Sequence, residues 1–223
     1  MRSPSRLAPW HVASLLLATL FWVGHALPPS VWTLAAKTGA ILALAAWCWP
    51  HTQGLSRLIP LALLAHATGD ALLEWARVQR QDWLIPAVAA FLVGHLINLR
   101  LFCAWRQPRW LNPALAGFTL LLALLAGTLV LRGLWLSQPV LLRVIVPIYM
   151  SVLLAMALIA QRTGNVTIAL GALSYLVSDA LIGLTHFAGW FPGFESGWLT
   201  WPSYYIGQWA LVTGLLHVLR KQD

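Results

Sequence analysis

The chain has 223 residues, of which 60% are hydrophobic and only 9% are charged. Soluble domains carry about 25% charged residues, so this composition excludes a soluble globular protein and is typical of an integral membrane protein. The formal net charge of +8 comes from basic residues that flank apolar segments and face anionic lipid headgroups, and we expect no nucleic-acid partner.

Proline, glycine and charged residues divide the sequence into apolar segments of about the length that crosses a bilayer as an α-helix. We predict an all-α integral membrane protein with eight transmembrane helices in one bundle. Because the connections are short, residues 1–223 are expected to form a single polytopic membrane domain. The predicted spans are about 10–27, 31–49, 57–75, 83–105, 111–131, 139–160, 165–187 and 199–219.

The charge distribution predicts the orientation of these spans. Arg2 and Arg6 precede the first span, as they would in a signal peptide, but Pro28-Pro29 fits a tight turn into the second span. An even number of spans returns both basic termini to one side. We expect a bacterial inner membrane protein with both termini in the cytoplasm. Cys48 and Cys103 then fall near cytoplasmic helix ends, where we expect packing rather than a disulfide.

Two segments of the chain have nearly the same sequence. Residues 69–73 and 178–182 each place one aspartate, Asp70 or Asp179, in an apolar stretch, although the chain has only six acidic residues. An ionisable side chain inside a span costs about 2.5–3.5 kcal/mol even on insertion-based scales, so such residues usually serve a function. Asp70 and Asp179 are therefore the candidate catalytic residues.

A second correspondence indicates an internal duplication. The two aspartates are related by an offset of 109 in the numbering, and residues 91–95 resemble residues 204–208 at an offset of 113. Two matches at similar offsets favour four helices followed by four related helices, with parallel halves related by an axis along the membrane normal. Coincidence in an apolar, low-complexity sequence is the alternative.

Other polar residues are expected near the two aspartates. At 1.5 Å per residue, Asp70 and Asp179 lie about 7–8 Å and about 12 Å below the outer boundary. His95 lies near mid-membrane, and Arg143 is four residues into the sixth span. Residues at the depth of the aspartates on other spans are Lys37, Tyr204, Tyr205 and Gln208.

Glu74 and His66 have less specific interpretations. Glu74 lies one turn beyond Asp70 and has Arg77 at i+3, a spacing that favours a salt bridge at the rim. His66 lies one turn before Asp70 and is a candidate metal ligand, but the sequence has no HExxH motif or paired-histidine spacing. We expect neither a metal nor another cofactor.

Two neighbouring carboxyls in a low dielectric do not both stay ionised. One is favoured as the acid, and the other, especially beside Lys37, remains a carboxylate. Such a pair suits protonation of a weakly basic substrate followed by delivery of water, as in glycosidic or enol-ether cleavage.

Four segments together resemble the YhhN family, which includes the lysoplasmalogenases. The likeness runs from Lys37 to about Gly214, and the segments are Gly69-Asp70-x-Leu72-Leu73, Gly94-His95, Ser178-Asp179-x-Leu181 and Tyr204-Tyr205-x-x-Gln208. The resemblance implies cleavage of the vinyl ether bond of a lysoplasmalogen to a fatty aldehyde and a glycerophospho-alcohol, with Asp70 and Asp179 as the two acids. Lys37 matches the lysine of the second span, which is usually followed by proline, and Thr38 departs from that pattern.

In the mechanism expected for enol-ether cleavage, one aspartate protonates the vinyl β-carbon, while the other stabilises the cation and deprotonates water. Asp70 is the first choice for the acid and Asp179 for the base, and the sequence leaves the reverse assignment open. Lys37 would tune the carboxylate or meet the substrate phosphate, for which Arg143 is a second candidate. One alternative is a proton-coupled carrier for a small or lipidic solute. Another is a zinc-dependent intramembrane lipid hydrolase that uses His66, Asp70, Asp179 and a further histidine. The sequence does not predict the oligomeric state.

Overall fold

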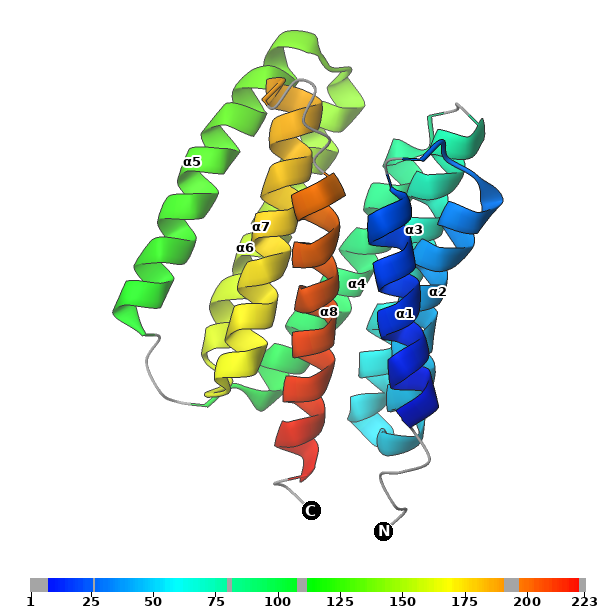
Figure 1. Cartoon of the computed structure of the whole chain (residues 1–223). Helices are drawn as coiled ribbons and strands as arrows, with labels where there is room; N and C mark the ends of the chain where they lie inside the picture. Colours follow the sequence, from blue (N-terminus) through cyan, green and yellow to red (C-terminus); the bar gives the residue numbers. More distant parts are fainter. Residues whose placement is uncertain (1–7, 26, 80–81, 108–111, 191–196, 221–223) are drawn as a thin grey trace. The chain divides into compact units, whose positions relative to one another are not determined.

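The computed structural model describes residues 8–25, 27–79, 82–107, 112–190 and 197–220. These residues form eight α-helices, with no β-strand among them (Figure 1). Each helix overlaps one predicted span, so the all-helical fold is confirmed. The helices are α1 (Ala8–Gly24), α2 (Val31–Cys48), α3 (Leu58–Gln79), α4 (Leu84–Trp105), α5 (Pro113–Ser137), α6 (Val140–Gln161), α7 (Val166–Ala188) and α8 (Gly197–Arg220).

Five helices in the described part of the chain are long and apolar enough to cross a membrane. They are α2 with its extension to His51, and α4, α5, α6 and α7. Helix α1 is apolar but shorter, and α3 carries the acidic residues Asp70 and Glu74. Crossing of the membrane by all eight helices stays a prediction.

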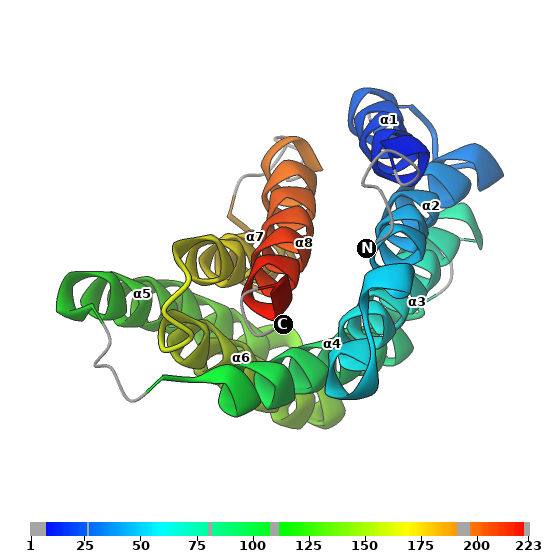
Figure 2. The same cartoon turned by 90° about the horizontal axis from the view of Figure 1, so that it is seen from below.

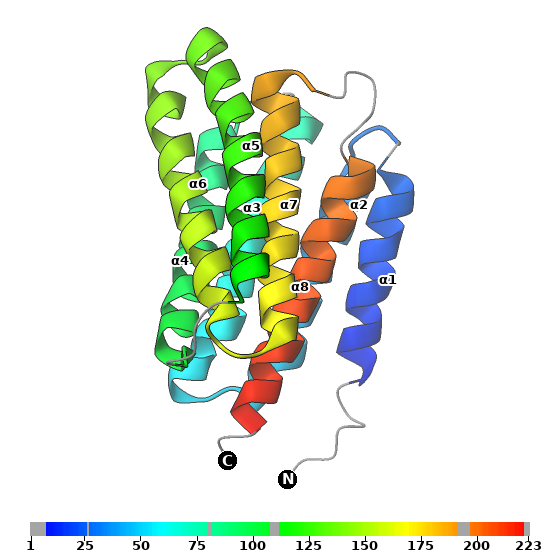
Figure 3. The ribbon, with the colours of Figure 1, turned by 90° about the vertical axis from the view of Figure 1, so that its left-hand side faces the viewer.

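Contacts divide the chain into two compact units, residues 1–101 with 215–223 and residues 102–214. In the first unit α2 packs against both α1 and α3, and the three helices follow one another in Figure 2. In the second unit α5, α6 and α7 each pack against the other two, and they lie side by side in Figure 3. The aspartates of the two repeated segments therefore belong to different units.

Short polar residues and one glycine set several helix ends. Ser30 caps α2 through a capping box with Thr33, so both side chains satisfy backbone groups at the first turn. Asn112 and Asn165 accept hydrogen bonds from the first backbone N–H groups of α5 and α7. Helix α7 ends at Gly189, whose φ of 66° favours glycine. Capping fixes where α2 begins, and this places Lys37 in its second turn.

Cys48 and Cys103 are both free thiols. Cys48 is fully buried at the end of α2, which agrees with the packing role expected of it. It packs there as a small apolar side chain.

Candidate functional site

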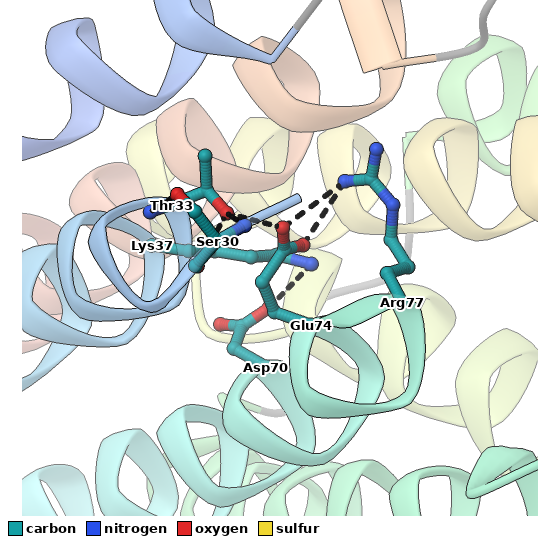
Figure 4. A network of polar contacts seen from close by, with 6 residues as sticks. All are labelled: Ser30, Thr33, Lys37, Asp70, Glu74 and Arg77. Carbon is teal, nitrogen blue, oxygen red and sulfur yellow. Dashed lines mark hydrogen bonds and ion pairs between the residues drawn. The ribbon is translucent and has the colours of Figure 1, made fainter. Parts of the chain in front are cut away.

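Lys37 and Asp70 form an ion pair between α2 and α3 in the first unit (Figure 4). Lys37 Nζ lies 3.5 Å from Asp70 Oδ1, and the two side chains are 14% and 2% exposed. The ammonium group also lies 5.5 Å from the ring centroid of Phe21 on α1. A buried carboxylate requires such compensation, so the expected pairing of Lys37 with an aspartate is confirmed, and the partner is Asp70.

Glu74 lies one turn beyond Asp70 on the same helix and is fully buried. Its carboxylate accepts a hydrogen bond from Thr33 Oγ1 at 2.8 Å and contacts Arg77 Nη1 at 3.0 and 3.2 Å (Figure 4). The expected ion pair with Arg77 is confirmed. Arg77, whose side chain is 41% exposed, fits the expected location at the rim. Glu74 does not, because its hydrogen bond with Thr33 of α2 places it in the interface between the two helices.

His66 and His95 lie next to each other on α3 and α4, with ring centroids 4.9 Å apart, and both are fully buried. The ring of Phe91 packs on the His66 ring, with centroids 6.0 Å apart. A Cβ atom at Gly94 would overlap the His66 ring. Gly94 therefore makes room for His66, one turn from Asp70.

Asp179 has a different partner in the second unit. Tyr149 Oη on α6 donates a hydrogen bond of 2.6 Å to Asp179 Oδ2 on α7. A distance in this range is typical of a hydrogen bond to a carboxyl oxygen. Each aspartate is thus contacted by a polar side chain from the preceding helix of its own unit.

Tyr204, Tyr205 and Gln208 are buried on α8. Gln208 Nε2 donates to Tyr204 Oη at 3.0 Å, and the ring of Trp201 packs against both tyrosines. The Tyr204 ring also meets Tyr175 of α7 edge-on, with centroids 5.4 Å apart. These three candidate residues lie together in the second unit.

Arg143 lies in the first turn of α6. Its Nε donates to the carbonyl oxygen of Gln138 at 2.7 Å, and its guanidinium group lies 5.5 Å from the ring centroid of Trp135. These contacts stabilise the end of α5, where the last carbonyls of a helix need donors.

Sequence reasoning did not identify Tyr149 or Thr33 as contacts of the acidic residues. Tyr149 follows Lys37 at an offset of 112, which lies between the offsets of 109 and 113 that relate the repeated segments. Extending that comparison by one helix would have found Tyr149. Thr33 gave no such signal, because a threonine in the first turn of a helix is explained by capping alone.

The described residues contain no group of three or more His, Cys, Asp or Glu side chains that could hold a metal ion. Comparison with known proteins gives one family. No curated protein and no solved structure matches the chain. The model of the YhhN family matches residues 32–215, which include Lys37, Asp70, Tyr149 and Asp179. The chain belongs to the YhhN family.

Proposed function

We propose that this protein is an intramembrane hydrolase that cleaves the vinyl ether bond of lysoplasmalogen-like lipids, with Asp70 and Asp179 acting on the same substrate. Membership of the YhhN family is consistent with this reaction. The observation that carries the proposal is the environment of the two acids. Each carboxyl lies in an apolar helix and contacts a polar side chain of the preceding helix, Lys37 in one unit and Tyr149 in the other.

We propose different roles for the two acids. The ammonium group of Lys37 stabilises Asp70 as a carboxylate, which suits a general base. Tyr149 Oη donates a hydrogen bond to Asp179, the other acid of the pair. Because Asp70 has the ammonium partner, we propose Asp70 as the base and Asp179 as the acid; the sequence left this assignment open, with Asp70 as the first choice for the acid.

These roles give a balanced cycle. Asp179 donates its proton to the β-carbon of the vinyl ether, and an oxocarbenium ion forms at the α-carbon. Asp70 takes a proton from water as the water oxygen bonds to the α-carbon, and a hemiacetal results. Asp70 then protonates the glycerol oxygen while Asp179 removes the hemiacetal hydroxyl proton. The carbon–oxygen bond breaks, aldehyde and glycerophospho-alcohol leave, and both acids return to their starting states.

An internal duplication of four helices is the second part of the proposal. His66 contacts Phe91 and faces Gly94 across α3 and α4, and Tyr175 contacts Tyr204 and faces Gly207 across α7 and α8. His66 and Tyr175 are related by an offset of 109, and Phe91 and Tyr204 by an offset of 113. Equivalent contacts at the offsets found in the sequence support the duplication, since chance similarity of two sequence segments would not by itself produce equivalent contacts.

Membrane topology can be tested separately. With eight spans and cytoplasmic termini, Ser137 at the end of α5 faces outward and Leu55 between α2 and α3 faces the cytoplasm. In a chain whose Cys48 and Cys103 are replaced by alanine, an impermeant thiol reagent should label Ser137→Cys in intact cells and Leu55→Cys only after lysis. Labelling of both before lysis would contradict this topology.

The reaction is tested with purified protein, a lysoplasmalogen and its saturated alkyl-ether analogue. Aldehyde should be released from the vinyl ether alone, because a saturated ether has no β-carbon that accepts a proton. Release from both lipids, or from neither, would contradict the proposal. Flux driven by a pH gradient in liposomes, without any product, would instead favour a carrier.

A further inference from the structure

Two polar contacts connect α2 and α3 at successive turns. Thr33 meets Glu74, and four residues further along α2 Lys37 meets Asp70, four residues earlier on α3 (Figure 4). Four residues correspond to about 6 Å along a helix. Because the two helices run in opposite directions, the two contacts share one register.

The contact between Thr33 and Glu74 is the more constrained of the two. Thr33 has a short, branched side chain whose hydroxyl is also held in the capping box with Ser30. Glu74 is fully buried and is held from the other side by Arg77. Lys37, in contrast, has a long flexible side chain, so the position of its ammonium group depends on the neighbouring residues. The Thr33–Glu74 contact therefore fixes the register in which Lys37 meets Asp70.

We propose that Glu74 is a positioning residue, which holds α2 in register with α3 through Thr33 and so sets the contact of Lys37 with Asp70. Its significance for catalysis rests on the proposed function. The position of the Lys37 side chain can be tested whether or not the proposed function is correct.

The reactivity of Lys37 provides a readout that does not depend on activity. The chain has two lysines, Lys37 and Lys221, so Lys221 serves as the internal reference. Full-length protein in micelles is treated with formaldehyde and cyanoborohydride, and methylation of both lysines is followed by peptide mass spectrometry. Glu74→Met removes the acceptor but leaves Thr33 its bond to Ser30. It should raise the rate at Lys37 relative to Lys221 about fivefold or more, because the pair with Asp70 loosens.

Three further variants complete the test. Glu74→Gln keeps an oxygen acceptor and should stay within about twofold of the wild type. Thr33→Val removes the donor and should act like Glu74→Met, and it decides the question if Glu74→Met does not fold. Thr68→Val is the matched control, because the Thr68 hydroxyl bonds Leu64 of its own helix. An unchanged relative rate at Lys37 in folded Glu74→Met or Thr33→Val would overturn the proposal.

Kinetics then separate positioning from stability alone. If the wild type hydrolyses lysoplasmalogen, Glu74→Met should lower kcat about tenfold and leave KM within about twofold, since the change acts on the reacting groups. A raised KM with unchanged kcat would overturn the link to catalysis. If the wild type releases no aldehyde, the proposed function fails, while the methylation rates still decide the role of Glu74.

Discussion

Asp70 and Asp179 each contact a polar side chain of the preceding helix in their own unit, and these two contacting side chains differ in charge. Asp70 is paired with the ammonium group of Lys37, whereas Asp179 accepts a hydrogen bond from the neutral phenol of Tyr149. A side chain of the preceding helix thus contacts each carboxyl, as an ion pair at Asp70 and as a hydrogen bond at Asp179. The proposed choice of Asp70 as the base rests on its ion pair with Lys37.

The next turn of the helix differs as well. Glu74 of α3 contacts Thr33 and Arg77, whereas Gly183 of α7 stands at the position related to Glu74 by the offset of the two aspartates. A Cβ atom at Gly183 would lie 2.8 Å from Val130 of α5, so a larger side chain there would require repacking. The first unit holds its lysine with a second polar contact, and the second unit uses this position for close helix packing.

The largest expected effect comes from removing either acid. Asp70→Asn and Asp179→Asn preserve shape but not proton transfer, and each should lower kcat about 10³-fold or more. Aldehyde release by purified protein, with folding checked by gel filtration, measures this. Near wild-type activity in either variant would mean that its carboxyl is not part of the reaction.

Removing the cation from the Asp70 site should have the next largest effect. Lys37→Met removes the ammonium group that pairs with the buried Asp70 carboxylate, which we expect to cost about 3 kcal/mol of stability and to lower kcat about 10²-fold. Thermal denaturation and kcat measure the two effects, and Lys37→Arg, which keeps the charge, should recover part of both. Equal losses in Lys37→Arg and Lys37→Met would show that charge is not what matters.

Removing the neutral donor from the Asp179 site should cost less. Tyr149→Phe deletes one hydrogen bond and keeps the ring, so kcat should fall about tenfold. The ratio between this loss and that of Lys37→Met measures the difference between the two sites. A loss as large as that of Lys37→Met would contradict the division of roles.

The smallest expected effects test the equivalence of the helix pairs. Gly94→Ala would overlap the His66 ring, and Gly207→Ala would approach Gly171 O at 3.0 Å and the Tyr175 ring at 3.1 Å. Each should lower stability by about 1–3 kcal/mol. Gly117→Ala, with no atom within 4 Å, is the control. If only one of the two variants were destabilised, the proposed equivalence of the helix pairs would lose its support.

Hydrophobic segments and their breaks predicted all eight helices, because apolar length and Pro or Gly breaks are local properties of the chain. The Lys37–Asp70 pair could also be predicted from the sequence, since a buried lysine and a buried acid have few other partners. The Tyr149 contact and the burial of Glu74 could not be predicted, because they depend on which faces of α6 and α3 pack against neighbouring helices. That choice is made by packing, at positions such as Gly94 and Gly207, and leaves little trace in local sequence.

The central claim is tested most directly by the source of the hydrogen that is added to the carbon next to the aldehyde group. If a carboxylic acid protonates the vinyl β-carbon, cleavage of a lysoplasmalogen in D₂O must place one solvent deuterium on the carbon next to the aldehyde. With rapid trapping by borohydride, mass spectrometry should show a product one mass unit heavier than that formed in H₂O. A product without this deuterium would contradict protonation at carbon, and with it the acid–base mechanism.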